Sequence, residues 1–212
     1  DHIRGVGVLA RRYNLPVYMT APTYQAAHKT IGQLPECRHF QPGTGFRVAN
    51  FKVHPFALSH DAADPVGFTF AANGSRIGIA TDLGRPTAQV RHALAECHLL
   101  VLEANHDEAL LHQGPYPWSV KSRISSSHGH LSNEAAAALA LDLLHPRLAA
   151  VVLAHLSGEC NAPGLAETVV GRALDGVGYR GFLTVAQQDE PTGPLDLVGL
   201  SRRLDPDQLP LL

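Results

Sequence analysis

Three short apolar segments of this chain each end in a His or an Asp, and this repeated pattern constrains the fold more than any other feature. The segments end at Ser59-His60, Thr81-Asp82 and Ala154-His155. Strand ends in a packed sheet are rigid, and in layered α/β folds they line the crevice where ligands bind. The pattern therefore predicts an α/β protein whose strand ends converge on one site. Any one of these residues taken alone is read more simply as a polar residue that is satisfied at a strand end.

Apolar periodicity and turn signals divide the rest of the chain into alternating elements. The Asn73-Gly74 pair predicts a two-residue hairpin turn, because both residues tolerate positive φ. Ser132 is the predicted N-cap of an Ala-rich helix. Helices are predicted at 3–13, 21–31, 86–96, 133–144 and 163–175, and a short helix with a loop at 107–127. Strands are predicted at 16–19, 45–59 (two strands), 67–72, 75–80, 99–105, 148–154, 182–186 and 195–200. We expect one domain over 1–200 and a loosely held tail over 201–212.

Composition points to imidazole chemistry. The 212 residues include 13 His but only 3 Cys, and the formal net charge is −2. The charge excludes a bulk basic field that would draw the protein to polyanions, so any such binding must be local. No apolar run reaches the roughly 18 residues of a membrane span, and no membrane partner is expected. Cys37, Cys97 and Cys160 form no CxxC pair, which favours buried thiols in a reducing cytoplasm.

An ordered set of motifs resembles the metallo-β-lactamase-fold hydrolases. Asp1-His2 matches the last two letters of that family's HxHxDH motif, and His60 in SHDAADPVGF, Asp82 in ATDLG and His155 in AHLS follow in the family's order. The stretches YPWSVKSRI and GHLSNEAA resemble the YycJ/WalJ branch, whose members are described as cytoplasmic DNA exonucleases. The resemblance implies an αββα four-layer sandwich whose N-terminal strands are missing from this chain.

The resemblance also implies two divalent metal ions, Zn²⁺ or Mn²⁺, in the full-length protein. Asp1, His2 and His155 resemble the ligands of one ion, Asp82 the carboxylate that bridges both, and His60 one ligand of the other. The two His of HxH would precede Asp1. We therefore expect one well-formed metal site in this chain, and a crippled two-metal catalyst.

Other residues are candidates for contacting substrate or supporting ligands. His130 in GHLSN precedes a helix N-terminus and resembles a residue that contacts the scissile phosphate or protonates the leaving group, so Asp1 and His130 are the predicted catalytic residues. Glu103, Asn105 and His106 resemble groups that orient ligand imidazoles, and a structural role in the loop is the open alternative. Candidate substrate contacts are Lys121, Arg123, Ser127 and Asn133. Trp118 and Tyr116 could stack on a base, but we expect a packed aromatic that anchors the loop.

These observations predict a metal-dependent phosphodiester hydrolase, a DNA exonuclease, that uses a metal-activated water. DNA or another phosphodiester is the expected partner. The best-known zinc lactamases of the family have a Cys at the position that Asp82 resembles, so the carboxylate here favours phosphodiester substrates. Two alternatives remain open. One is a hydrolase of small esters, thioesters or lactams on the same fold, and the other is a non-catalytic metal-binding protein.

Overall fold

The structure is a computed structural model that describes residues 2–204. Its strands are β1 Pro16–Met19, β2 Glu36–His39, β3 Phe46–Val48, β4 Phe51–Ala57, β5 Val66–Ala72, β6 Ser75–Ala80, β7 Leu99–Glu103, β8 Ala150–Ala154 and β9 Phe182–Val185. Its helices are α1 Val6–Tyr13, α2 Ala21–Ile31, α3 Ala88–Leu94, α4 Glu108–Gln113, α5 Trp118–Ile124, α6 Asn133–Asp142, α7 Pro163–Gly176 and α8 Leu197–Leu204.

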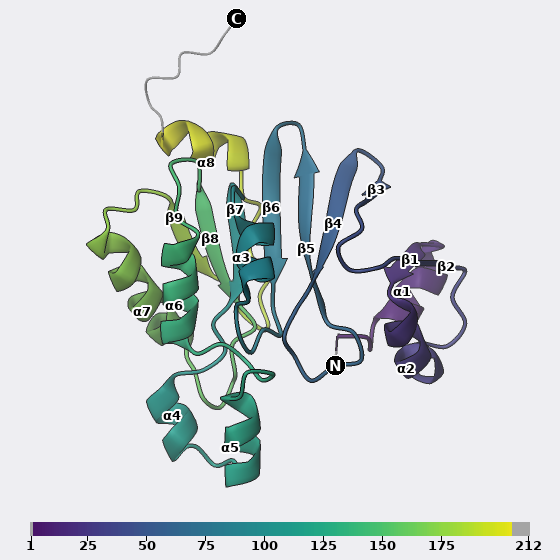
Figure 1. The fold of residues 1–212 in the computed structure, drawn as a ribbon, viewed down its shortest axis with the longest axis horizontal. Coiled ribbons are helices and arrows are strands. Elements are labelled where there is room, and N and C mark those ends of the chain that lie inside the picture. Colours follow the sequence, from purple (N-terminus) through teal and green to yellow (C-terminus); the bar gives the residue numbers. More distant parts are fainter. Residues whose placement is uncertain (1, 205–212) are drawn as a thin grey trace, which may run out of the picture.

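A seven-stranded sheet in the order β3-β4-β5-β6-β7-β8-β9 organises the molecule (Figure 1). Strands β3 to β6 are antiparallel, and β6 to β9 are parallel. Because β4 and β6 both pair antiparallel with β5, they run in the same direction. The carboxyl ends of β4, β6, β7 and β8 therefore lie at one edge of the sheet.

The core lies between this sheet and helices α3, α6 and α7, which cover the same face (Figure 1). Alternate residues of the central strands point to opposite faces. Leu102 and Leu153 belong to the core under these helices, whereas Leu99 and Val152 pack on the other face with residues near α8. Burial on both faces explains why β7 and β8 are almost continuously apolar in sequence.

A small unit of α1, α2, β1 and β2 lies beside the β4 side of the sheet (Figure 1). Strands β1 and β2 form a parallel pair, and Met19, Ala27 and Ile31 make a separate apolar cluster. Strand β2 was not predicted, because its sequence Glu-Cys-Arg-His is polar and only its pairing with β1 identifies it as a strand.

Local signals account for most helix starts and for the hairpin. Ser132 Oγ accepts a hydrogen bond from Ala135 N at the start of α6, as predicted, and Thr87 caps α3 in the same way. At the hairpin turn Asn73 and Gly74 have φ values of 51° and 77°. These match the left-handed conformations that an Asn-Gly turn requires.

One predicted strand near the C-terminus is wrong. Residues 195–200 are predicted as a strand, but Leu197 begins helix α8. The helix forms because Leu197 and Leu200 are one turn apart and both pack on the sheet, while Asp196 caps its start. Helix α8 includes residues 201–204 of the predicted tail, and the other residues of the tail, 205–212, lie outside the described part.

The large sheet and the helices packed on it match the expected α/β class. Within residues 2–204 the second sheet has only the two strands β1 and β2. The predicted loop within 107–127 also contains a second helix, α5. In the same residues no helix is both long and apolar enough to cross a bilayer.

Candidate metal centre

The carboxyl edge of the sheet brings four imidazoles around one carboxylate. His60 follows β4, Asp82 follows β6 and His155 directly follows β8. His2 reaches this edge from the segment before α1, and His130 from the loop before α6. The predicted convergence of three strand ends is therefore what the structure has.

Asp82 lies at the centre of this group. Its Oδ2 is 2.9 Å from His2 Nε2, and its Oδ1 is 3.4 Å from His60 Nε2. The same Oδ1 is 3.7 Å from His155 Nε2 and 3.8 Å from His130 Nδ1. Neighbouring rings have centroids 5.2 Å apart for His2 and His155, 5.4 Å for His155 and His130, and 4.9 Å for His130 and His60. The four rings thus form an arc around the carboxylate.

The backbone at two of these positions adopts the left-handed conformation. Asp82 and His155 have φ values of 57° and 59°. Such conformations are uncommon for residues other than glycine, and they persist where surrounding contacts hold them. Asn105 supplies one such contact, because its Nδ2 donates a 2.9 Å hydrogen bond to the carbonyl oxygen of His155.

Glu103 anchors two of the imidazoles from beneath. Its side chain is fully buried, and its Oε1 accepts hydrogen bonds of 2.7 Å from Nδ1 of both His130 and His155. Its Oε2 accepts from the backbone N–H groups of Leu83 and Leu131. With Nδ1 of His155 carrying the proton, its unprotonated Nε2 faces Asp82 at 3.7 Å, which is the form that binds a metal.

The hydrogen bonds between Glu103 and the imidazoles also affect the pKa values of Glu103 and His155. Burial by itself would raise the pKa of Glu103, but the bonds from His130 and His155 outweigh burial and lower the pKa. The hydrogen bond to Glu103 in turn raises the pKa of His155. Glu103 is therefore an ionised carboxylate that is fully occupied by donors.

His60 is held in a similar way by the backbone. Its Nδ1 lies 2.9 Å from the carbonyl oxygen of Gly129, which leaves Nε2 facing Asp82. This arrangement depends on close packing of two loops at glycine. A Cβ at Gly129 would lie 2.1 Å from Ile124 O, and one at Gly84 would lie 2.6 Å from Ser127 O.

The donor set fits a divalent metal ion. Asp82, Glu103, His130 and His155 offer ligand atoms that all lie within 4.8 Å of one another. Both carboxylate oxygens of Glu103 already accept two hydrogen bonds each. We therefore assign Glu103 to positioning the imidazole rings and not to binding the ion. Nitrogen and oxygen donors without thiolate are typical of Zn²⁺ and Mn²⁺ sites.

Comparison with known proteins agrees with this geometry. The family model described as a beta-lactamase superfamily domain matches residues 1–155. The chain is 37% identical over 181 residues to the exodeoxyribonuclease YycJ of Bacillus anthracis, covering 84% of this chain and 69% of the relative. The chain belongs to the metallo-β-lactamase superfamily. The exodeoxyribonuclease WalJ of Streptococcus pneumoniae is 35% identical over 178 residues, which cover 82% of this metallo-β-lactamase-fold chain and 66% of the relative.

Solved structures of metallo-β-lactamase proteins share the fold at low sequence identity. The metallo-beta-lactamase fold protein YhfI of Bacillus subtilis has a TM-score of 0.65 and 15% identity, over 89% of this chain and 70% of that one. Zn²⁺-bound PqqB of Methylobacterium extorquens has a TM-score of 0.58 and 15% identity, over 92% and 70% of the two chains. The α/β fold of this metallo-β-lactamase chain is thereby confirmed.

The structure gives different surroundings to the other residues predicted for this metallo-β-lactamase site. Asp1 lies outside the described residues. Lys121 lies near His130, and its Nζ donates to the carbonyl oxygen of His112 at 2.6 Å. Arg123 forms an ion pair with Asp61, which sequence reasoning did not single out. Ser127 is exposed, and its carbonyl oxygen accepts from Ser59 Oγ.

Asn133 does not match the predicted contact with substrate. Its side chain is fully buried, and its amide exchanges two hydrogen bonds with the amide of Asn161, at 3.0 and 2.8 Å. The pair connects the start of α6 to the loop before α7. No sequence signal singled out Asn161, because the two residues are far apart in the chain.

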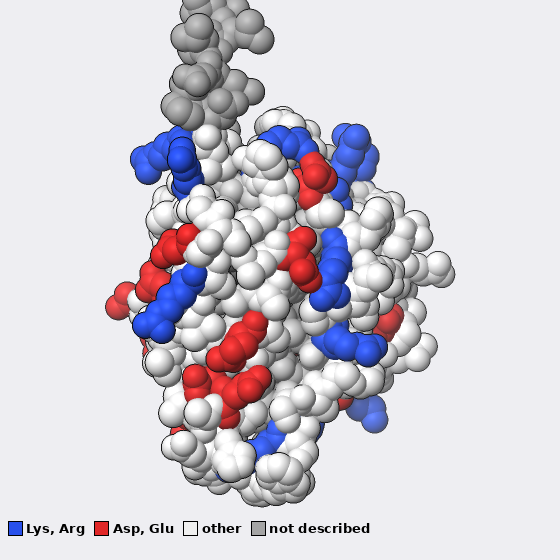
Figure 2. All heavy atoms as spheres, turned by 60° about the vertical axis from the view of Figure 1, so that its left-hand side comes forward, with Lys and Arg blue, Asp and Glu red and all other residues white. Residues whose placement is uncertain are grey.

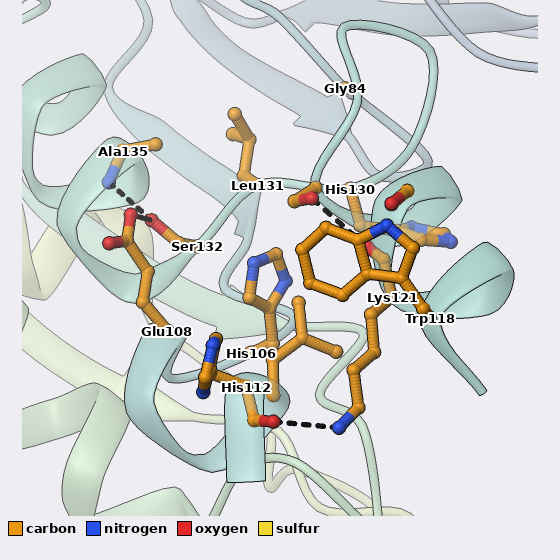
Figure 3. Close-up of a pocket in the computed structure, with 13 residues that line it drawn as sticks. Gly84, His106, Glu108, His112, Trp118, Lys121, His130, Leu131, Ser132 and Ala135 are labelled. Atoms are coloured by element: carbon orange, nitrogen blue, oxygen red, sulfur yellow. Dashed lines mark hydrogen bonds between the residues drawn. The ribbon is translucent and has the colours of Figure 1, made fainter. Parts of the chain in front are cut away.

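Trp118 differs from expectation, because it is predicted to pack as a loop anchor but is 72% exposed. For His106 the role of orienting a ligand imidazole stays a prediction, and its Nδ1 has no hydrogen-bond partner among the described residues. Both side chains line a cavity next to His130 (Figure 3).

Proposed function

We propose that this protein is a metal-dependent exodeoxyribonuclease that hydrolyses the phosphodiester bonds of DNA. The observation that carries the proposal is the arc of four imidazoles around Asp82, with the Nδ1 atoms of three of them tied to Glu103 or to Gly129. Two relatives at 35–37% identity are named exodeoxyribonucleases.

In this proposal His2 and His155 would hold one metal ion and His60 would hold the other, with Asp82 as a ligand of both. A divalent ion held there would supply an activated water and neutralise charge on the phosphate. Glu103 keeps the His155 ring in one orientation and tautomer. His130, whose Nδ1 is tied to Glu103 and lies 3.8 Å from Asp82, is the residue that would contact the phosphate or protonate the leaving oxygen. Asp1 would be a further ligand of the metal ion that His2 and His155 hold.

Binding of DNA would depend on local groups and not on a charged surface. Lys and Arg side chains are scattered among Asp and Glu on the face shown in Figure 2, with no continuous basic surface. Arg123 is paired with Asp61, whereas Lys121 lines the cavity to which His130 also belongs, so Lys121 is the proposed cation for a phosphate. Ser127 and Arg123 remain proposed contacts, the latter after exchange of Asp61 for phosphate. A cytoplasmic location, which the cysteine usage favours, belongs to the same proposal.

The test is digestion of linear duplex DNA that carries a label at one end, with closed circular DNA as the matched substrate. With the full-length protein, we expect nucleotide release from the linear form that requires Mn²⁺ or Zn²⁺ and stops in EDTA. Asp82→Asn should lower the rate by at least about 100-fold, because it removes the charge shared by the ligands. Asp175→Asn, a change at an exposed position on α7, should leave the rate unchanged.

The alternative enzymes predict a different substrate profile. Hydrolysis of nitrocefin or of a thioester, without release of nucleotides from DNA, would contradict the proposal in favour of a small-molecule hydrolase. Tight binding of metal without any turnover would favour a non-catalytic metal-binding protein.

A further inference from the structure

A cavity of about 400 Å³ opens next to the metal centre, between helices α4 and α5 and the start of α6. Small-ligand sites in proteins have volumes of roughly 300–1,000 Å³. His130 belongs to the walls of this cavity, and its Nδ1 also lies 3.8 Å from Asp82. A molecule in the cavity would therefore adjoin any group that reacts at the metal centre.

Trp118 provides a flat apolar surface on this cavity. It is 72% exposed, although large aromatic side chains usually bury most of their area. Helix α5 has no buried residue, so the indole of Trp118 does not belong to a local apolar core. Figure 3 shows Trp118 and His106 beside the same space, with Lys121 extending past the indole. An exposed indole in this setting is suited to stacking on a nucleobase, which has a π-face whatever its identity.

His106 independently indicates a polar ligand. Its side chain is 2% exposed, it lines the cavity, and its Nδ1 has no partner among the described residues. Burial lowers the pKa of His106, so the ring is neutral and offers one donor and one acceptor. Buried polar atoms are nearly always hydrogen-bonded, and a ligand in the cavity would supply the missing bond.

The remaining polar groups of the cavity match the two ends of a nucleotide. Lys121 uses one N–H for His112 O, and the ammonium has two more for a phosphate. Glu108 lies toward Ser132, from which its Oε1 accepts a hydrogen bond of 3.3 Å. Its carboxylate can accept from an exocyclic amino group of a base. The ammonium of Lys121 and the carboxylate of Glu108 thus lie on different parts of the cavity wall.

We propose that this cavity binds one nucleoside that flanks the scissile phosphate, with its base stacked on Trp118 and hydrogen-bonded by His106. The inference rests on the proposed function, because it assigns a subsite of that nuclease. Stacking on the indole does not discriminate among bases, whereas the acceptor at Glu108 favours a base that carries an exocyclic amino group. It makes the enzyme specific for nucleotides over other phosphodiesters.

The first test uses the fluorescence of Trp118, the single Trp of the chain. In the metal-free protein, dAMP should quench this fluorescence saturably, whereas ribose 5-phosphate and inorganic phosphate should not. The Trp118→Phe variant shows which part of the signal belongs to Trp118. Quenching by all three compounds alike, or by none, would overturn base stacking whether or not the protein hydrolyses DNA.

The second test pairs a variant with a substrate that lacks one base. An oligonucleotide with an abasic nucleotide at the end from which digestion proceeds should have a KM roughly tenfold higher than the intact one, which corresponds to about 1.4 kcal/mol of stacking. Trp118→Ala should raise the KM of the intact oligonucleotide by the same factor and abolish the difference between the substrates, while Trp118→Phe should preserve it. Val198→Ala, which shortens an exposed side chain on α8, is the matched control.

Hydrolysis of methyl p-nitrophenyl phosphate separates this inference from the proposed function. This substrate has no base and reads out the metal centre alone, so Trp118→Ala should leave its rate unchanged. If the abasic penalty survives in Trp118→Ala, the subsite is wrong while the nuclease stands. If neither DNA nor this small diester is hydrolysed, the nuclease is wrong.

Discussion

At the scale of single residues, Glu103 organises the site more than any ligand candidate does. One buried carboxylate accepts four hydrogen bonds, two from imidazoles and two from backbone N–H groups. Such a group costs free energy to bury and is retained only where all its acceptor positions are used. The bonds to His130 and His155 fix the ring orientation that metal binding needs.

Replacing this carboxylate by an amide should weaken the metal site. Glu103→Gln places an NH₂ group where only donors face it, so one imidazole loses its partner and its preferred tautomer. We expect the affinity for Zn²⁺ or Mn²⁺ to fall by roughly 10- to 100-fold in isothermal titration calorimetry. Glu167→Gln, at an exposed position on α7, is the control and should match the unaltered protein.

The same carboxylate predicts how the metal-free protein responds to acid. The pKa of Glu103 is below its ordinary value of 4.5 in the folded protein, so the folded state favours the ionised form. Its stabilising contribution is fully present above pH 4.5 and is lost as the pH falls through the lowered folded value. Urea unfolding in EDTA should show stability falling below pH 4.5, and the part due to Glu103 should be absent from Glu103→Gln. An identical acid response in both proteins would contradict this assignment.

At the scale of elements, each site residue is held where a secondary-structure element ends. Strands β4, β6 and β8 position His60, Asp82 and His155 at one edge, and β7 ends at Glu103 itself. Helix α8 acts on the opposite face, where it covers Leu99, Ala150 and Val152 together with neighbouring residues. Its start is fixed by Asp196, whose Oδ1 accepts from Gly199 N at 3.0 Å.

Removing this N-cap should destabilise α8 and expose the sheet face beneath it. Asp196→Ala leaves an N–H of the first turn without an acceptor, which we expect to lower the free energy of unfolding by about 1 kcal/mol. Urea denaturation followed by circular dichroism measures the change. Val198→Ala, at a position that is 56% exposed on the same helix, should change stability by less than about 0.5 kcal/mol. Equal effects of the two variants would mean that Asp196 does not cap the helix.

At the scale of the whole molecule, the metal site joins parts of the chain that are distant in sequence. His2, His60, Asp82, His130 and His155 come from five separate segments. An ion bound among them cross-links the folded state and has no comparable site in the unfolded chain. Metal binding should therefore stabilise the entire fold.

Thermal unfolding measures this coupling. At a free metal concentration 100 times the dissociation constant, binding adds about 2.7 kcal/mol. For a domain of this size we expect the midpoint temperature to rise by about 5–10 °C. Asp82→Asn should remove the shift, and Asp175→Asn should retain it. A midpoint that metal does not move would contradict a folded-state metal site.

Local sequence signals identify most of the elements and most of the metal-site candidates. The Asn73-Gly74 turn, the Ser132 cap and the apolar runs that become β7 and β8 are local signals, and His60, Asp82 and His155 stand at visible strand ends. Their convergence follows from strand direction, because strands that run the same way end at the same edge of a sheet.

Tertiary structure decided the rest, because these features depend on contacts between distant residues. That Glu103 accepts from both His130 and His155 follows from the β7–β8 pairing and from the loop that reaches across them. The buried Asn133–Asn161 pair removes one expected contact with substrate, and the ion pair with Asp61 engages Arg123, which is another. The segment 195–200 is predicted as a strand, and packing on the sheet makes Leu197 and Leu200 one face of a helix. Only the folded chain shows an exposed Trp118 and an unpartnered His106 on one cavity, since burial is a property of the assembled molecule.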